Sequence, residues 1–214
     1  MVDDVLRRLE LTRYPDAETV EDWQQGVPLS YQQELIRYWR HDYDWQRVPT
    51  RLNRYDNFTT QIDGISIHFL HIRSAHSNAT PLLMTHGWPG SVLEFLDVIE
   101  PLTNPTQTAG KAGDAFHLII PSLPGFGFSG APTTTGFGVE KIATMWDELM
   151  LRMGYQQYLA QGGDWGSLVT QSLLLGETHC KSGHVNLPIV MPDALTLESS
   201  EPGEQATLAA AMHY

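Results

Sequence analysis

The residues with the clearest chemical potential surround one aspartate in a short glycine-rich segment. Residues 162–166 read Gly-Gly-Asp-Trp-Gly and lie between a segment typical of a strand and one typical of a helix. Small residues two positions before and after Asp164 let the chain turn sharply and raise that side chain above the end of the strand. The N-terminus of a helix favours a carboxylate, so we expect Asp164 to be ionised at neutral pH and available as a nucleophile. The alternative is that Asp164 only caps the helix.

A second segment could supply the hydrogen-bond donors that such a nucleophile needs. Residues 86–90 read His-Gly-Trp-Pro-Gly and follow another apolar segment. We expect the backbone N–H groups of Trp88 and Trp165 to stabilise negative charge on an oxygen of the reacting group. We interpret His86 as a residue that fixes this loop rather than as a catalytic base. The glycines and the proline that shape the two turns are Gly87, Pro89, Gly90, Gly162, Gly163 and Gly166.

A third segment matches the spacing of a dinucleotide-binding fingerprint. Residues 125–130 read Gly-Phe-Gly-Phe-Ser-Gly after a predicted strand. The fingerprint requires a helix that begins at the glycines, because the N-terminus of that helix binds the pyrophosphate. No helix is expected here before about Val139, so we reject nucleotide binding. We expect Phe126 and Phe128 to line the mouth of a pocket instead.

The elements that must position these segments alternate between strands and helices, which is typical of an α/β fold with a mostly parallel sheet. An Asp63-Gly64 turn predicts that an antiparallel hairpin opens the sheet. Before it, residues 1–57 read as a helical, aromatic-rich extension, in which Ser30 and Gln33 predict a capping box. We expect strands at residues 58–62, 65–72, 81–85, 116–123, 158–161 and 185–190, and helices at residues 92–102, 139–153 and 167–175.

The composition limits the classes of protein to consider. The chain has 214 residues, of which 42% are hydrophobic and 18% charged, as expected for a globular protein. Its formal net charge of −12 disfavours binding to nucleic acid or to an anionic membrane surface. The single cysteine, Cys180, excludes an intramolecular disulfide and a zinc site of several thiolates. Without a signal peptide or a run of 18 apolar residues, we expect a soluble protein of the cytoplasm or another intracellular compartment.

Six segments that together extend over most of the chain occur in an order typical of one enzyme family. They are residues 26–31 (Gly-Val-Pro-Leu-Ser-Tyr), 38–39 (Tyr-Trp), 43–45 (Tyr-Asp-Trp), 86–91 (His-Gly-Trp-Pro-Gly-Ser), 121–129 (Pro-Ser-Leu-Pro-Gly-Phe-Gly-Phe-Ser) and 162–166. On these segments the sequence resembles the microsomal-type epoxide hydrolases, without the membrane anchor of that type. The resemblance implies an α/β-hydrolase fold, incomplete and with about six strands. It also implies a division into an N-terminal extension (residues 1–57), part of the hydrolase core (58–190) and the start of a truncated cap region (191–214).

The resemblance also implies a chemistry for the site. Asp164 would attack a small apolar epoxide and form an ester, and water would then hydrolyse that ester to release a vicinal diol. Trp88 and Trp165 would supply the oxyanion N–H groups, and no metal or cofactor would take part. Two alternatives remain: a haloalkane dehalogenase-like hydrolase with the same aspartate, and a non-catalytic fragment that binds small molecules.

The histidine and the acid that activate water in this family come later than the nucleophile in the chain. His179, His184 and His213 follow Asp164, but we expect none of them at that position. We therefore assign no acid–histidine pair in these 214 residues and expect at most a single alkylation of Asp164. The oligomeric state is left open.

Overall fold

The computed structural model of the chain describes residues 2–189, 201, 203 and 204. It divides into two compact units, Met1–Arg54 and Tyr55–Tyr214. His213 and almost all of the predicted cap region lie outside the described residues. Among the helices of the described part, none is both long and apolar enough to cross a lipid bilayer.

The first unit consists of helices and connecting turns. An ion pair between Arg40 and Glu10, with 3.0 Å between nitrogen and oxygen, joins two of the helices. The predicted capping box at Ser30 is wrong, because the helix begins one residue before Ser30 and directly after Pro28, and no side chain of its N-cap residue bonds the first turn. The Leu29 N–H instead donates a hydrogen bond to the carboxylate of Glu18 at 2.8 Å. The helices are α1 (Val2–Glu10), α2 (Leu29–His41) and α3 (Arg47–Leu52).

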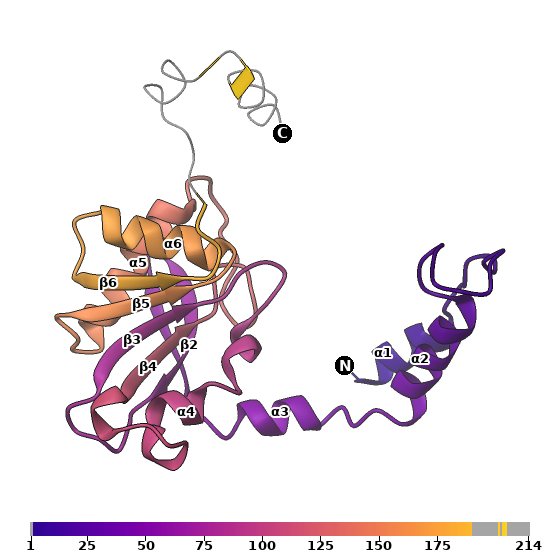
Figure 1. The fold of residues 1–214 in the computed structure, drawn as a ribbon, viewed down its shortest axis with the longest axis horizontal. Helices are drawn as coiled ribbons and strands as arrows, with labels where there is room; N and C mark the ends of the chain where they lie inside the picture. The colour runs from indigo at the N-terminus through magenta and orange to yellow at the C-terminus, as the bar shows by residue number, and fades with distance from the viewer. Residues whose placement is uncertain (1, 190–200, 202, 205–214) are drawn as a thin grey trace. The chain divides into compact units, whose positions relative to one another are not determined.

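The second unit is built on one six-stranded sheet with the order β1-β2-β4-β3-β5-β6 (Figure 1). β1 and β2 form the predicted antiparallel hairpin, in which Asp63 and Gly64 both adopt positive φ angles, 49° and 78°. β2 pairs antiparallel with β4, and β3, β4, β5 and β6 pair in parallel. The strands are β1 (Asn57–Ile62), β2 (Ile65–Ile72), β3 (Thr80–Thr85), β4 (Phe116–Pro121), β5 (Tyr158–Gly162) and β6 (Cys180–Val185).

The last strand differs from its prediction. The apolar residues 185–190 favoured a strand there, but β6 ends at Val185 and Leu187 is 45% exposed. β6 is a polar segment that becomes a strand because its backbone pairs with β5. A Cβ atom at Gly183 would lie 2.8 Å from a methyl group of Leu174 and 2.9 Å from that of Thr170, so a larger residue there would require these two side chains to shift.

The predicted helix over residues 92–102 is also wrong. A short 3₁₀ helix, η1 (Val92–Phe95), and a separate helix, α4 (Ile99–Thr103), replace it. Pro101 gives the physical reason, since in a continuous helix its ring would clash with the carbonyl of residue 97 and remove one hydrogen bond. The three-residue period of η1 buries Val92 and Phe95 and leaves Leu93 40% exposed.

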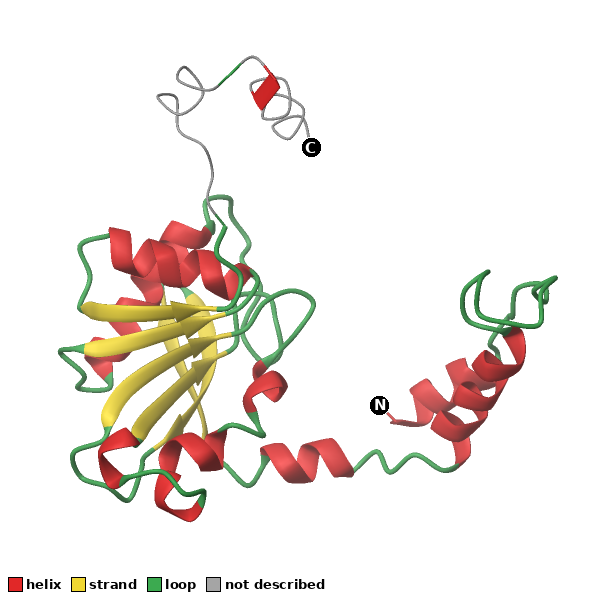
Figure 2. Ribbon diagram, in the orientation of Figure 1, coloured by secondary structure: helices red, strands yellow, loops and turns green. Residues whose placement is uncertain are grey.

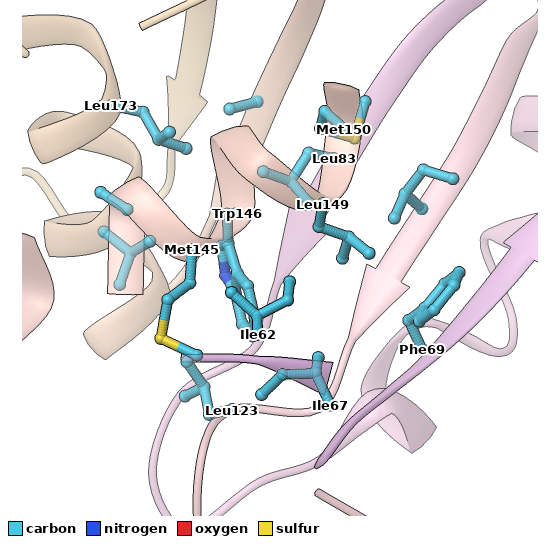
Figure 3. Close-up of a cluster of buried hydrophobic side chains, with 14 of the residues drawn as sticks. Ile62, Ile67, Phe69, Leu83, Leu123, Met145, Trp146, Leu149, Met150 and Leu173 are labelled. Carbon is cyan, nitrogen blue, oxygen red and sulfur yellow. The ribbon is translucent and has the colours of Figure 1, made fainter. Parts of the chain in front are cut away.

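Helices α5 (Val139–Arg152) and α6 (Trp165–Leu175) pack on the sheet and on each other (Figure 2). α5 ends as predicted near Gly154, which has a φ of 86°. The core lies between these helices and the sheet, and Figure 3 shows the Trp146 ring among side chains of α5 and of the strands. Trp146, Leu149, Ile67 and Leu83 are fully buried in it. This core fixes the strand end and the helix start between which Asp164 lies.

Candidate active site

Asp164 lies in a sharp turn between β5 and α6. Its backbone has a φ of 53° and a ψ of −125°, a conformation that is unfavourable for any residue except glycine. The turn is closed by the Ser167 N–H, which donates to the Asp164 carbonyl at 2.9 Å. Strain of this kind, at a polar residue between a strand and a helix, is typical of a nucleophile elbow.

Several glycines around Asp164 lie close to other parts of the chain, two of them to backbone and three to side chains. A Cβ atom at Gly162 would overlap the backbone carbonyl of Gly166, and one at Gly166 would overlap the carbonyl of Thr85. At Gly87 it would overlap the Asp164 side chain. A Cβ atom at Gly163 would press on the Asn186 side chain, and one at Gly90 would overlap the Glu94 carboxylate. The pattern of small residues therefore reflects close approach between three segments of the chain.

The backbone of Trp88 lies beside the carboxylate of Asp164. The Trp88 N–H donates a hydrogen bond to Oδ1 of Asp164 at 2.7 Å, across 76 residues of sequence. Pro89 follows it with a cis peptide bond. Trp165 is the first residue of α6, directly after Asp164. Trp88 and Trp165 are 65% and 51% exposed.

His86 is fully buried below the Trp88 loop, with both ring nitrogens bonded to backbone. Its Nε2 accepts from the Leu123 N–H at 3.1 Å, and its Nδ1 is 2.9 Å from the carbonyl oxygen of Gly87. Burial lowers the pKa of His86, while the Gly87 carbonyl and the negative Glu94 partly oppose this shift. With no free ring nitrogen, this histidine fits the predicted loop-fixing role and not that of a base.

The two phenylalanines of the predicted pocket lie in different surroundings. Phe126 lines an apolar cavity of about 330 Å³, together with the Trp165 side chain and the start of α5. The Phe126 ring also meets the His86 ring edge-on, with 5.7 Å between the centroids. Phe128 is not among the lining residues of that cavity; it is 65% exposed and contacts the His68 ring at 5.1 Å.

A network around His68 escaped the sequence reasoning. Nδ1 of this buried histidine is 2.9 Å from the Ser122 hydroxyl, and its Nε2 is 2.8 Å from the Asn57 side-chain oxygen. The Ser129 hydroxyl accepts from the His68 N–H and donates to the Ser122 carbonyl. These bonds tie the loop over residues 122–130 to β2. The only local signs of these hydrogen bonds were the two serines, Ser122 and Ser129, on either side of the Pro-Gly-Phe-Gly-Phe segment.

His179 and His184 are the described histidines that follow Asp164 in the chain. His179 contacts Asp147 through Nδ1 at 2.9 Å, directly before β6 begins, whereas Asp164 follows the opposite end of the parallel strand β5. His184 lines a cavity of about 300 Å³ with residues of β3, β4 and β5. Among the described residues, no group of three or more His, Cys, Asp or Glu side chains could bind a metal ion.

The buried histidines make the stability of the fold dependent on pH. Burial lowers the pKa of His68, His71, His86 and His117, and Arg73 lowers the pKa of His71 and His117 further. These groups stay neutral in the folded state, while in the unfolded chain they bind protons below about pH 6.5. The free energy of unfolding is therefore expected to be constant between about pH 7 and pH 8 and to fall as the pH decreases below about 6.5.

Urea unfolding between pH 5 and pH 8 measures this dependence. His68→Gln should reduce its slope, because one proton-binding difference between the two states is removed. His41→Gln is the matched control, since His41 is exposed on α2 and its replacement should leave the slope unchanged. A free energy of unfolding that stays constant or rises on acidification from pH 7 to pH 5.5 would contradict the prediction.

Two known families match the chain. The family described as "Epoxide hydrolase N terminus" matches residues 1–95, and the family described as "alpha/beta hydrolase fold" matches residues 80–202. The second match contains β3, the Trp88 loop and the Asp164 turn. The two matches follow each other in the order that the sequence segments predict.

Curated relatives and solved structures agree with these matches. A putative epoxide hydrolase of Stigmatella aurantiaca is 54% identical over 99% of this chain and 48% of its own length, and epoxide hydrolase 1 of Sus scrofa is 37% identical over 92% and 44%. The chain thus spans about half the length of these curated relatives. The Aspergillus niger epoxide hydrolase structure has a TM-score of 0.76 at 32% identity, covering 97% of this chain and 55% of that one. The chain therefore belongs to the epoxide hydrolase family of α/β hydrolases.

Proposed function

We propose that Asp164 is the nucleophile of an epoxide hydrolase and that an ester on its carboxylate is the intermediate. The observation that carries the proposal is the 2.7 Å hydrogen bond from the Trp88 N–H to Oδ1 at a strained turn. This bond orients the carboxylate and leaves Oδ2 as the attacking oxygen. A carboxylate suits an epoxide because its carbon is saturated, so attack is a displacement that needs no base.

The first step forms one bond and breaks another. Oδ2 attacks a ring carbon of the epoxide, the bond from that carbon to the ring oxygen breaks, and the oxygen takes up a proton from solvent. The product is a hydroxyalkyl ester of Asp164, whose carbonyl oxygen is the former Oδ1. The Trp88 N–H already points at this atom, so its hydrogen bond persists through the reaction.

The second step hydrolyses the ester. Water adds to the ester carbonyl and loses one proton to solvent, and the negative charge develops on the oxygen beside the Trp88 N–H, with the Trp165 N–H proposed as the second donor. When this tetrahedral intermediate collapses, the bond from the carbonyl carbon to the ester oxygen breaks. That oxygen takes the proton of the newly added hydroxyl, which releases the diol and restores the carboxylate. One oxyanion donor typically contributes about 3–4 kcal/mol to such a step.

The described residues favour accumulation of the ester in this chain. Both ring nitrogens of His86 are occupied by backbone, and His179 is paired with Asp147 at the other end of the sheet. His184 lines a cavity whose lining residues do not include Asp164. We infer that none of these three histidines takes a proton from a water molecule at the ester. We propose that the 214-residue chain undergoes alkylation and then retains the adduct.

Intact-mass spectrometry after incubation with styrene oxide tests this proposal. The expected result is a mass increase of one epoxide per chain, with the ester assigned to Asp164 by peptide mapping. A folded chain that gains no adduct, or gains it on another residue, would overturn the nucleophile assignment. Steady formation of several diol molecules per chain would overturn the proposed retention of the ester.

A further inference from the structure

The peptide unit between Gly87 and Trp88 is hydrogen-bonded at both of its ends. Its N–H group, on Trp88, donates to Asp164 Oδ1 at 2.7 Å. Its carbonyl, on Gly87, lies 2.9 Å from His86 Nδ1 and also accepts from the Gly90 N–H at 2.9 Å. Because a peptide unit is planar, any group that fixes the direction of the carbonyl also fixes the direction of the N–H.

The surroundings of His86 select one tautomer of its ring. The Leu123 N–H donates to Nε2 at 3.1 Å, so Nε2 has no proton. A carbonyl oxygen can only accept, so Nδ1 must bear the proton that Gly87 receives. The ring has no exposed surface, which favours its neutral form. The His86 ring therefore accepts a hydrogen bond from the loop over residues 122–130 and donates one to the carbonyl of the Gly87–Trp88 peptide.

We propose that His86 is a positioning residue that orients and polarises the Gly87–Trp88 peptide for reaction at Asp164. The inference rests on the proposed function of Asp164. Hydrogen bonds in series strengthen one another, so donation into the Gly87 carbonyl makes the Trp88 N–H a stronger donor. An error of about 1 Å in such a group can reduce a rate about a hundredfold.

Two substitutions separate this role from a purely structural one. In His86→Asn the side-chain NH₂ occupies the position of Nδ1 and can still donate to Gly87, but Leu123 loses its acceptor. In His86→Gln the side-chain oxygen reaches the position of Nε2 and can accept from Leu123, but Gly87 loses its donor. Each variant removes one buried hydrogen bond, so both should melt at a lower temperature than the wild type.

The rate of Asp164 alkylation by styrene oxide, followed by intact mass, is the first readout. We expect His86→Gln to react at least about tenfold more slowly than the wild type, and His86→Asn to recover most of that loss. The backbone amide of Trp88 in ¹H–¹⁵N NMR spectra is the second readout. Its proton signal should move upfield in His86→Gln, because its hydrogen bond weakens, and should stay close to the wild-type position in His86→Asn.

Ser122→Ala is the matched control. It removes the hydroxyl that bonds His68, one residue before Leu123, without touching the Gly87–Trp88 peptide. It should lower the melting temperature and leave both the alkylation rate and the Trp88 amide signal unchanged. If His86→Asn and His86→Gln slow alkylation equally, or neither slows it, the positioning role is wrong. If the wild type gains no adduct, the proposed function fails, and an unchanged Trp88 signal in His86→Gln would independently overturn this inference.

Discussion

Asp164→Asn is expected to abolish formation of the covalent epoxide adduct. The amide is almost identical in shape to the carboxylate, and its oxygen can still accept the Trp88 hydrogen bond, so the turn should keep its structure. An uncharged amide is a very poor nucleophile towards a saturated carbon, and loss of a sole nucleophile reduces rates by at least about a thousandfold. Intact-mass spectrometry under the conditions that alkylate the wild type measures the effect.

Asp3→Asn is the matched control for this variant. Asp3 is exposed in the first turn of α1, so its replacement changes the charge by the same amount without altering the turn at residue 164. It should be alkylated at the wild-type rate. If Asp164→Asn is folded and still gains one epoxide, the nucleophile is another residue, and peptide mapping would identify it.

Gly166→Ala is expected to cause a large loss of stability. The added Cβ atom would overlap the backbone carbonyl of Thr85, at the end of β3, rather than the end of a flexible side chain. Relief requires α6 to move away from the sheet, and α6 carries the fully buried Val169. We expect a decrease of about 3 kcal/mol or more in the free energy of unfolding, measured by urea titration.

Gly113→Ala provides the comparison for the same chemical change. A Cβ atom at Gly113 would have no neighbour within 4 Å, and the residue has no positive φ. Its replacement should change the free energy of unfolding by no more than about 0.5 kcal/mol. A folded Gly166→Ala protein whose stability is as close to the wild type as that of Gly113→Ala would show that the close approach of α6 to β3 is not required.

The sequence predicts best where the structure depends on residues close together in the chain. The Asp63-Gly64 hairpin and the end of the helix over residues 139–153 were predicted correctly, because positive φ angles favour glycine or aspartate in the turns that follow. The sharp turn at Asp164 was also predicted, from the glycines on both sides of it. Pro101 is a further local signal, and it explains why two short helices replace the single helix predicted over residues 92–102.

Where distant segments compete, local patterns failed. The capping box predicted at Ser30 is absent, and the carboxylate of Glu18, eleven residues earlier, accepts the hydrogen bond of the Leu29 N–H at the start of α2. A strand was expected at residues 185–190, but the polar segment β6 forms the strand instead. The reason is that β5 offers backbone hydrogen-bonding groups, and β6 is the segment that lies beside them in the folded chain. In both cases the interaction that forms joins segments that come close together only in the folded chain.

At the turn around Asp164, the contributions of the sequence and of the tertiary structure can be separated clearly. The sequence alone determined that the Asp164 carboxylate lies at a sharp turn and that residues 86–90 and 162–166 could supply hydrogen-bond donors to it. Both predictions depend only on the spacing of glycines along the chain. Only the tertiary structure decided that the Trp88 N–H reaches Asp164 across 76 residues, and that Leu123 selects the tautomer of His86. A hydrogen bond has a direction as well as a distance, and both are fixed only when the core of strands and helices brings those loops together.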